Sequence, residues 1–220
     1  MTKKLVTKDL NDLTFETSSQ HILLEEYRAL HSDYIQQRSE GVTRMNFFVT
    51  AISVILGGIL IFASGNNATM IFYFRHVLLA ALIILTTIGI DVYLFLIQRN
   101  IDIDQDIRGM ARVRIYFVKH DPGLEKFFVT GIYDSPSKHI TNKGSGMRRS
   151  AEIIVSFLVG IALVTLSSYF PLTLEINIAI GVSMTILTAL LLDLFAQRKL
   201  GKALSDAQKE MKFNINVTPK

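Results

Sequence analysis

Two carboxylates interrupt otherwise apolar stretches of this sequence, and their positions make them the first candidates for chemistry. Asp91 lies about two helical turns before Arg99, and Asp193 lies slightly over one turn before Arg198. A carboxylate in hydrocarbon costs about 3 kcal/mol or more, so it normally faces protein or water. The two acids could therefore line a path for a cation or proton. Alternatively, each is hydrogen-bonded to a neighbouring helix or paired with its arginine, and the shallow position of Asp193 favours this second interpretation there.

The other residue types that carry catalysis or bind metals are dispersed along the chain. The five histidines show no metal-ligand spacing, and the absence of cysteine excludes thiolate sites and disulfides. The sequence contains no phosphate-binding glycine loop and no nucleophile-elbow motif. We therefore expect no enzyme activity, no metal and no cofactor.

Basic residues form the third group of candidates. Arg108, Arg112 and Arg114 follow the second apolar stretch, and Arg148 and Arg149 precede the third. Arginines at such positions reach lipid headgroup phosphates. The same residues could bind the phosphate of a nucleotide or nucleic acid. The usual charge asymmetry of membrane proteins already explains them, so a nucleic-acid partner is not expected.

Four long apolar stretches must position these candidates. They cover residues 45–64, 72–98, 151–170 and 176–196 of a chain that is 50% hydrophobic. A bilayer core needs about 20 apolar residues of helix, so each stretch is long enough to cross. The links between the first two stretches and between the last two are short. The expected fold is an all-α polytopic membrane protein with four transmembrane helices in two hairpins; buried helices of a soluble domain are the alternative.

Positive charge predicts how the spans are oriented. Of the 23 Lys and Arg residues, six precede the first span, ten lie between the hairpins and six follow the last span, which leaves only Arg75. The positive-inside rule places these three segments in the cytoplasm. We therefore expect cytoplasmic segments at 1–44, 99–150 and 197–220 around the hairpins 45–98 and 151–196, in the inner (plasma) membrane. The polar first 45 residues predict no cleavable signal peptide.

The two expected hairpins resemble each other, and small residues recur in them at a spacing of four. The pairs are Ser53 with Gly57, Ser156 with Gly160, and Ala179 with Ser183. The first two pairs precede Asp91 and Asp193 by 38 and 37 positions, counted from the serine, which indicates a duplication. Small residues at this spacing allow helix backbones to approach closely. We expect these positions at helix contacts, within one subunit or between the subunits of a homo-oligomer.

Helical stripes of apolar residues continue beyond the spans. They consist of Leu23, Tyr27, Leu30 and Tyr34, of Ile103, Ile107, Met110 and Phe117, and of Leu200, Leu204, Ala207 and Met211. Such stripes predict that the span helices extend into the cytoplasm and pack on one another. Asp121 before Pro122 predicts a new helix start, and the polar segment 135–146 is expected to be flexible.

One stretch resembles a known family. Residues 27–48 end in Arg38-Ser39-Glu40-Gly41-Val42-Thr43-Arg44-Met45-Asn46-Phe47-Phe48. This resembles the membrane-entry helix of small bacterial proteins of the SLATT superfamily, in which an Arg-rich polar helix leads into a two-span hairpin. The resemblance covers about residues 20–98, and the chain departs from the family in having two hairpins. It implies a self-associating, pore-forming membrane module in a bacterial defence system.

These features favour a non-enzymatic, oligomeric membrane module that anchors, senses or forms a pore. Its expected partners are the lipid bilayer, further copies of the chain and a cytoplasmic protein. The alternative is a small ion or solute channel that uses Asp91 and Asp193.

Overall fold

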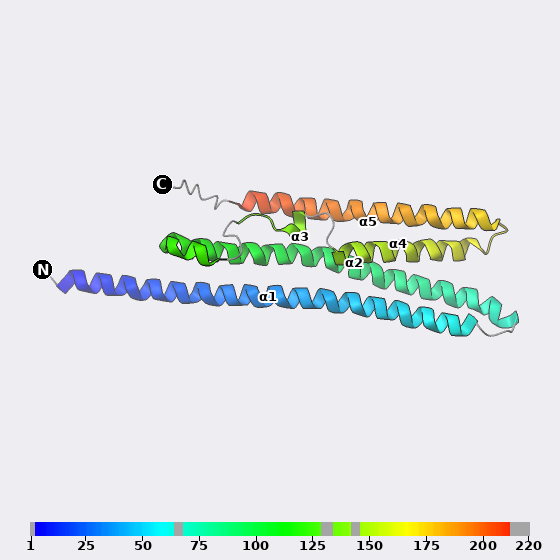
Figure 1. The fold of residues 1–220 in the computed structure, drawn as a ribbon, viewed down its shortest axis with the longest axis horizontal. Coiled ribbons are helices and arrows are strands. Elements are labelled where there is room, and N and C mark those ends of the chain that lie inside the picture. Colours follow the sequence, from blue (N-terminus) through cyan, green and yellow to red (C-terminus); the bar gives the residue numbers. More distant parts are fainter. Residues whose placement is uncertain (1–2, 64–67, 129–133, 142–145, 212–220) are drawn as a thin grey trace.

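The chain folds into long helices that lie side by side in the computed structural model (Figure 1). The structure describes residues 3–63, 68–128, 134–141 and 146–211. The elements are α1 (Lys3–Ala63), α2 (Ala68–His120), the 3-10 helix η1 (Pro122–Phe127), α3 (Lys138–Thr141), α4 (Gly146–Ser167) and α5 (Leu174–Glu210). Within these described ranges there is no strand, so the all-α prediction is confirmed.

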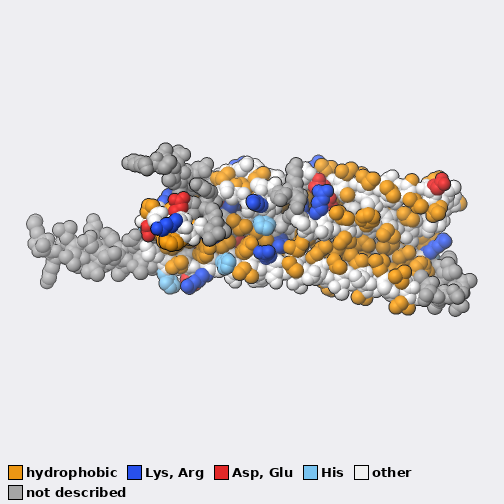
Figure 2. Space-filling model, viewed as in Figure 1, with side chains coloured by type: hydrophobic (Ala, Val, Ile, Leu, Met, Phe, Trp, Pro, Cys, Tyr) orange, Lys and Arg blue, Asp and Glu red, His pale blue; other side chains and the backbone are white. Residues whose placement is uncertain are grey.

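Four helices, α1, α2, α4 and α5, are long and apolar enough to cross a membrane. On the face seen in Figure 2, apolar side chains gather over one half of the molecule, and charged side chains gather mainly over the other half. We call these the apolar half and the polar half. The prediction of four helices with the length and composition of membrane spans is therefore confirmed.

Three of these helices run from one half into the other without a break. α1, α2 and α5 have 61, 53 and 37 residues, well beyond the length that a bilayer requires. Proline inside a helix removes a hydrogen bond and clashes with the preceding turn. The prolines within the described ranges lie outside the long helices: Pro122 opens η1, Pro136 precedes α3, and Pro171 lies between α4 and α5. The expected segment boundaries at 44/45, 98/99 and 196/197 thus fall inside continuous helices.

The core lies where α2 and α4 cross, with α1 and α5 on either side. α1 packs along α2 and α4 along α5, each pair running in opposite directions (Figure 1). Leu82, Leu85 and Val155 are buried in this core. A Cβ atom on Gly89 of α2 would lie 2.6 Å from Phe48 Cζ and 2.7 Å from Val155 Cγ2. The absence of a side chain at this glycine therefore lets α1 and α4 both contact α2.

The helices also pack on one another in the polar half, as their apolar stripes predicted. The stripe residues of α1, α2 and α5 are buried or half-buried. Leu30 of α1 packs on Gly109 of α2, where a Cβ atom would lie 2.8 Å from Leu30 Cδ1. Side-chain packing of this kind fixes the distance between two helix axes.

The segment between α2 and α4 contains two short elements. The predicted helix start is confirmed, because Asp121 caps η1 by accepting a 2.9 Å hydrogen bond from the Gly123 amide. The segment 135–146, expected to be flexible, contains α3. The Ser137 amide donates a 2.6 Å hydrogen bond to buried Asp104 Oδ1, which holds α3 against α2. Residues 129–133 and 142–145 lie outside the described residues.

Candidate functional site

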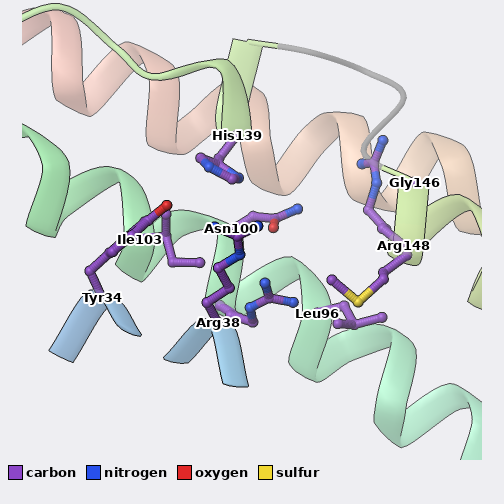
Figure 3. A pocket seen from close by; sticks show the side chains of 10 residues that line it. Tyr34, Arg38, Leu96, Asn100, Ile103, His139, Gly146 and Arg148 are labelled. Carbon is purple, nitrogen blue, oxygen red and sulfur yellow. The ribbon is translucent and has the colours of Figure 1, made fainter. Parts of the chain in front are cut away.

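A cavity of about 310 Å³ lies at the junction of the apolar and polar halves, among α1, α2, α3 and α4 (Figure 3). We call it the junction cavity. It is lined by Tyr34, Arg38, Leu96, Arg99, Asn100, Ile103, His139, Gly146, Met147 and Arg148. Four helices thus contribute to one site, although their residues are far apart in the sequence.

Arg99 is the most constrained cation of the junction cavity. Only 6% of this residue is exposed, and its Nε atom has no hydrogen-bond partner among the described residues. Its guanidinium lies against the backbone of α1 at Gly41, where a Cβ atom would collide with it. Burial lowers the pKa of Arg99, and the positive charge of Arg38 lowers it further. The folded chain therefore holds two cations near each other at this site.

Arg148 adds to the positive charge of the cavity, and Asn100 and His139 add uncharged polar groups. Arg148 and Asn100 are buried, with 2% and 5% exposed. Burial lowers the pKa of His139, as do the charges of Arg99 and Arg38, whereas Asp104 raises it. His139 is therefore neutral near pH 7 and can act as a donor or an acceptor there.

The basic residues assigned to lipid headgroups or phosphate have different surroundings. Arg108 Nε pairs with buried Asp104 at 2.9 Å, and Arg108 Nη1 pairs with Glu210 of α5 at 3.2 Å. Arg112 Nε pairs with Asp134 at 2.8 Å.

Arg114 and the two arginines of α4 complete this group. The Arg114 guanidinium donates a 3.1 Å hydrogen bond to the Tyr27 hydroxyl of α1. Arg148 lines the junction cavity, and Arg149 is exposed. Among these predicted residues, the structure thus brings only Arg148 to the cavity. Headgroup contact stays a prediction for the group.

The two acids in the apolar half differ in exposure. Asp91 is exposed on α2, and it has no hydrogen-bond or ion-pair partner within the described part of the chain. Asp193 of α5 is half-buried and accepts a 2.5 Å hydrogen bond from Gln197 Nε2. Beside it, the Tyr93 hydroxyl of α2 donates to the Leu192 carbonyl at 2.7 Å. The structure does not bring the two acids into contact.

The predicted helix-packing pairs also differ in burial and in the space beside them. Ser156 and Gly160 are buried, and a Cβ atom on Gly160 would lie 2.9 Å from the Gly181 carbonyl oxygen of α5. Ser53 is exposed, and a Cβ atom on Gly57 would meet nothing within 4 Å.

The third pair, Ala179 and Ser183, is exposed on α5. Only the Ser156 and Gly160 pair thus lies at a contact within the chain.

Sequence reasoning did not identify the junction cavity. Arg38 was quoted only as part of the resemblance, and Arg99 only as a partner for Asp91. No local pattern indicates that these two residues approach each other, because their proximity depends on the register of α1 against α2. Gly41, on the helix face that Arg99 contacts, is the one local signal, since a glycine inside a helix has a cost that packing must offset.

The part of the chain that the structure describes contains no group of three or more His, Asp or Glu residues that could hold a metal ion. Comparisons of the chain with protein-family models, with curated proteins and with solved structures find no match.

Proposed function

We propose that the chain is a non-enzymatic membrane module that assembles with further copies of itself and senses through its polar half. In this proposal the four long helices cross the inner membrane as two hairpins. Both termini and the polar half lie in the cytoplasm, as the charge distribution predicts. The resemblance of residues 20–98 to SLATT proteins adds a role in bacterial defence to the proposal.

The observation that carries the proposal is the unequal use of one repeated motif. In α4, Ser156 is buried and Gly160 lies at the contact with α5, where the helix backbones approach closely. The equivalent Gly57 of α1 has open space beside it. Small residues in a membrane helix create a surface on which another helix can pack closely. We assign the open surface around Ser53 and Gly57 to a second copy of the chain.

The continuity of the helices supports the sensing part of the proposal. α1 and α2 each run from the apolar half, past the junction cavity, into the polar half. A change in the packing around the cavity therefore acts on helices that also form spans. Rigid helices with two packing arrangements can carry such coupling.

Exposed apolar residues support a protein partner for the polar half. Ile22 and Ile35 of α1 and Phe127 of η1 are 65%, 53% and 70% exposed, outside the expected spans. Ile22 and Ile35 are 13 residues apart on α1, so these side chains offer separate apolar contact points and not one continuous surface. In the proposal they contact a second copy or a cytoplasmic protein.

The mass of the complex in a maltoside detergent, measured by light scattering, tests self-association. The wild-type chain is expected to give a multiple of 24.7 kDa after correction for detergent. Gly57→Ile is expected to reduce this mass, and Gly57→Ala is expected to retain it. Ala80→Ile, a similar enlargement at an exposed position of α2 outside the three small-residue pairs, is the matched control. A monomeric wild-type chain, or an equal loss of mass in both isoleucine variants, would refute this assignment.

A channel formed between copies is the second candidate function. The exposed carboxylate of Asp91 favours it, because a carboxylate that faces lipid is costly and one that faces water in a channel is not. Within one copy, the core at the level of the spans is filled by Leu82, Leu85 and Val155. A conducting path would therefore have to lie between subunits.

A further inference from the structure

We propose that the junction cavity binds one phosphate group per chain, held between Arg38 of α1 and Arg99 of α2. This inference deepens the proposed function, because it names the ligand class of the sensing site. It rests on the proposed function in one respect only, which is the placement of the cavity on the cytoplasmic side of the membrane.

The charges around the cavity require an anion. Among the described residues, no Asp or Glu lines the cavity or lies within ion-pair distance of Arg38 or Arg99. Asp104, a nearby acid, already accepts hydrogen bonds from Arg108 and from the Ser137 amide. A buried cation without a counter-ion is strongly unfavourable. A bound anion would supply the missing charge.

Arg99 shows where that anion would bind. Its side chain is buried and lies against the α1 backbone at Gly41, beside the open space of the cavity. Its Nε–H group lacks an acceptor in the described part of the chain. A guanidinium offers its donors in a planar fork that matches two oxygens of a phosphate. Arg38 is exposed at the same cavity and can approach the ligand from α1.

The remaining lining residues fit a phosphate better than a smaller anion. Tyr34, Asn100 and His139 offer neutral donors around the two cations (Figure 3). Several donors and more than one positive charge match the oxygens and the negative charge of a phosphate group. The cavity volume of about 310 Å³ lies at the lower end of the range for small-ligand sites.

The phosphate could belong to a lipid headgroup or to a soluble compound. Leu96 and Met147 line the cavity together with the polar groups, so an acyl chain and a headgroup could both find contacts. Basic pockets between membrane helices on the cytoplasmic side are typical headgroup sites. The shared chemistry is the phosphate group, and the experiment distinguishes its sources.

Binding is measured on the full chain in a phosphate-free maltoside detergent, with two probes. Inorganic phosphate is titrated by calorimetry, and phosphatidylglycerol is added in steps and detected by native mass spectrometry. One phosphate per chain indicates a soluble ligand, and one retained lipid without phosphate binding indicates a headgroup. Both results support the proposal. If neither probe binds the wild-type chain, the proposal is overturned.

Two variants and a control test the assignment to the cavity. Arg38→Gln removes an exposed charge and is expected to weaken binding about tenfold or more, as does the loss of a charged hydrogen bond. Arg99→Lys keeps the charge but removes the fork, and should also weaken binding. Arg149→Gln makes the same charge change at an exposed residue outside the cavity and should bind as the wild type does.

Equal weakening in Arg38→Gln and Arg149→Gln would show unspecific attraction and overturn the proposal. The mass of each variant is measured in the same samples. If a variant loses phosphate binding while the mass of its complex is unchanged, the phosphate site has failed and self-association has not.

Discussion

Gly160 of α4 lies directly against Gly181 of α5, so that a Cβ atom on Gly160 would be 2.9 Å from the Gly181 carbonyl oxygen. The same carbonyl accepts a 2.9 Å hydrogen bond from Thr185 Oγ1, and the Thr185 side chain would collide with that Cβ atom as well. The two helices therefore have no space for a side chain at position 160.

Gly160→Ala is expected to destabilise the chain by about 1–3 kcal/mol, the usual cost of adding a methyl group to a filled contact. Gly201→Ala is the matched control, because nothing lies within 4 Å of a Cβ atom there. Alanine is also the better helix former, so the control should gain up to about 1 kcal/mol. Thermal melting in maltoside detergent measures both. Equal melting temperatures for the two variants would contradict the close contact.

Asp104→Asn is expected to destabilise the polar half by about 3–5 kcal/mol. The substitution removes the buried partner of Arg108, and the other partner, Glu210, is 61% exposed. It also weakens the hydrogen bond that holds the Ser137 amide. Hydrogen exchange at residues 134–141 should become faster. Asp206→Asn, which alters an exposed pair with Lys209, should leave exchange there unchanged. Wild-type exchange rates in Asp104→Asn would refute this role.

Asp106 is expected to make the polar half less stable as the pH rises. Burial, and the negative charges of Asp33 and Asp102, raise the pKa of Asp106 to about 6. The folded chain therefore binds this proton more tightly than the unfolded chain, in which the pKa is 3.8. Stability falls as the pH rises from about 4 to about 6, and the loss is complete above that range. Asp106→Asn should reduce this fall in melting temperature.

His139 changes the stability with pH in the opposite direction, and the same experiment controls for it. Its pKa is lowered in the folded chain, so its contribution to stability grows as the pH rises toward 6.5. The difference between the wild type and Asp106→Asn isolates Asp106, because His139 is common to both. Asp206→Asn, at an exposed position, should show the wild-type pH profile. An unchanged profile in Asp106→Asn would mean that Asp106 carries no such linkage.

Reconstitution in liposomes tests the channel candidate. We expect wild-type liposomes to leak ions no faster than empty ones, because a module that anchors and senses needs no conducting path between its copies. The double variant Asp91→Asn, Asp193→Asn should behave in the same way. Ion flux in the wild type that the double variant abolishes would replace the anchor-and-sensor account with the channel.

The helices of the apolar half could be predicted from sequence because their signal is local. A run of about 20 apolar residues without proline specifies a long helix whatever it packs against. The Asp121 cap is a local signal too, and this prediction was confirmed. The residues of the stripe that ends at Tyr34 are half-buried on continuous α1, and the placement of this part of α1 in the cytoplasm stays a prediction. The short helix α3 could not be predicted, because it depends on a hydrogen bond from Ser137 to Asp104 of another helix.

The candidate site was much harder to predict, because it depends on contacts between helices, as α3 does. Charge alone predicts headgroup contact for Arg108 and Arg112, and it does not indicate the ion pairs with Asp104, Asp134 and Glu210 that the structure shows. Arg99 has no such ion pair among the described residues, and it lies against α1 at Gly41. Which arginine pairs and which does not is decided by helix register, and a single sequence does not encode register in any local pattern.

The sidedness of the polar half is the central claim, and labelling of introduced cysteines tests it most directly. The chain has no cysteine, so Ser32→Cys in α1, Ser205→Cys in α5 and Glu175→Cys at the opposite end of α5 each provide one thiol at an exposed position. The account predicts that a membrane-impermeant maleimide labels Glu175→Cys in intact spheroplasts. It predicts that Ser32→Cys and Ser205→Cys are labelled only after permeabilisation. Labelling of either serine variant in intact spheroplasts would contradict the account.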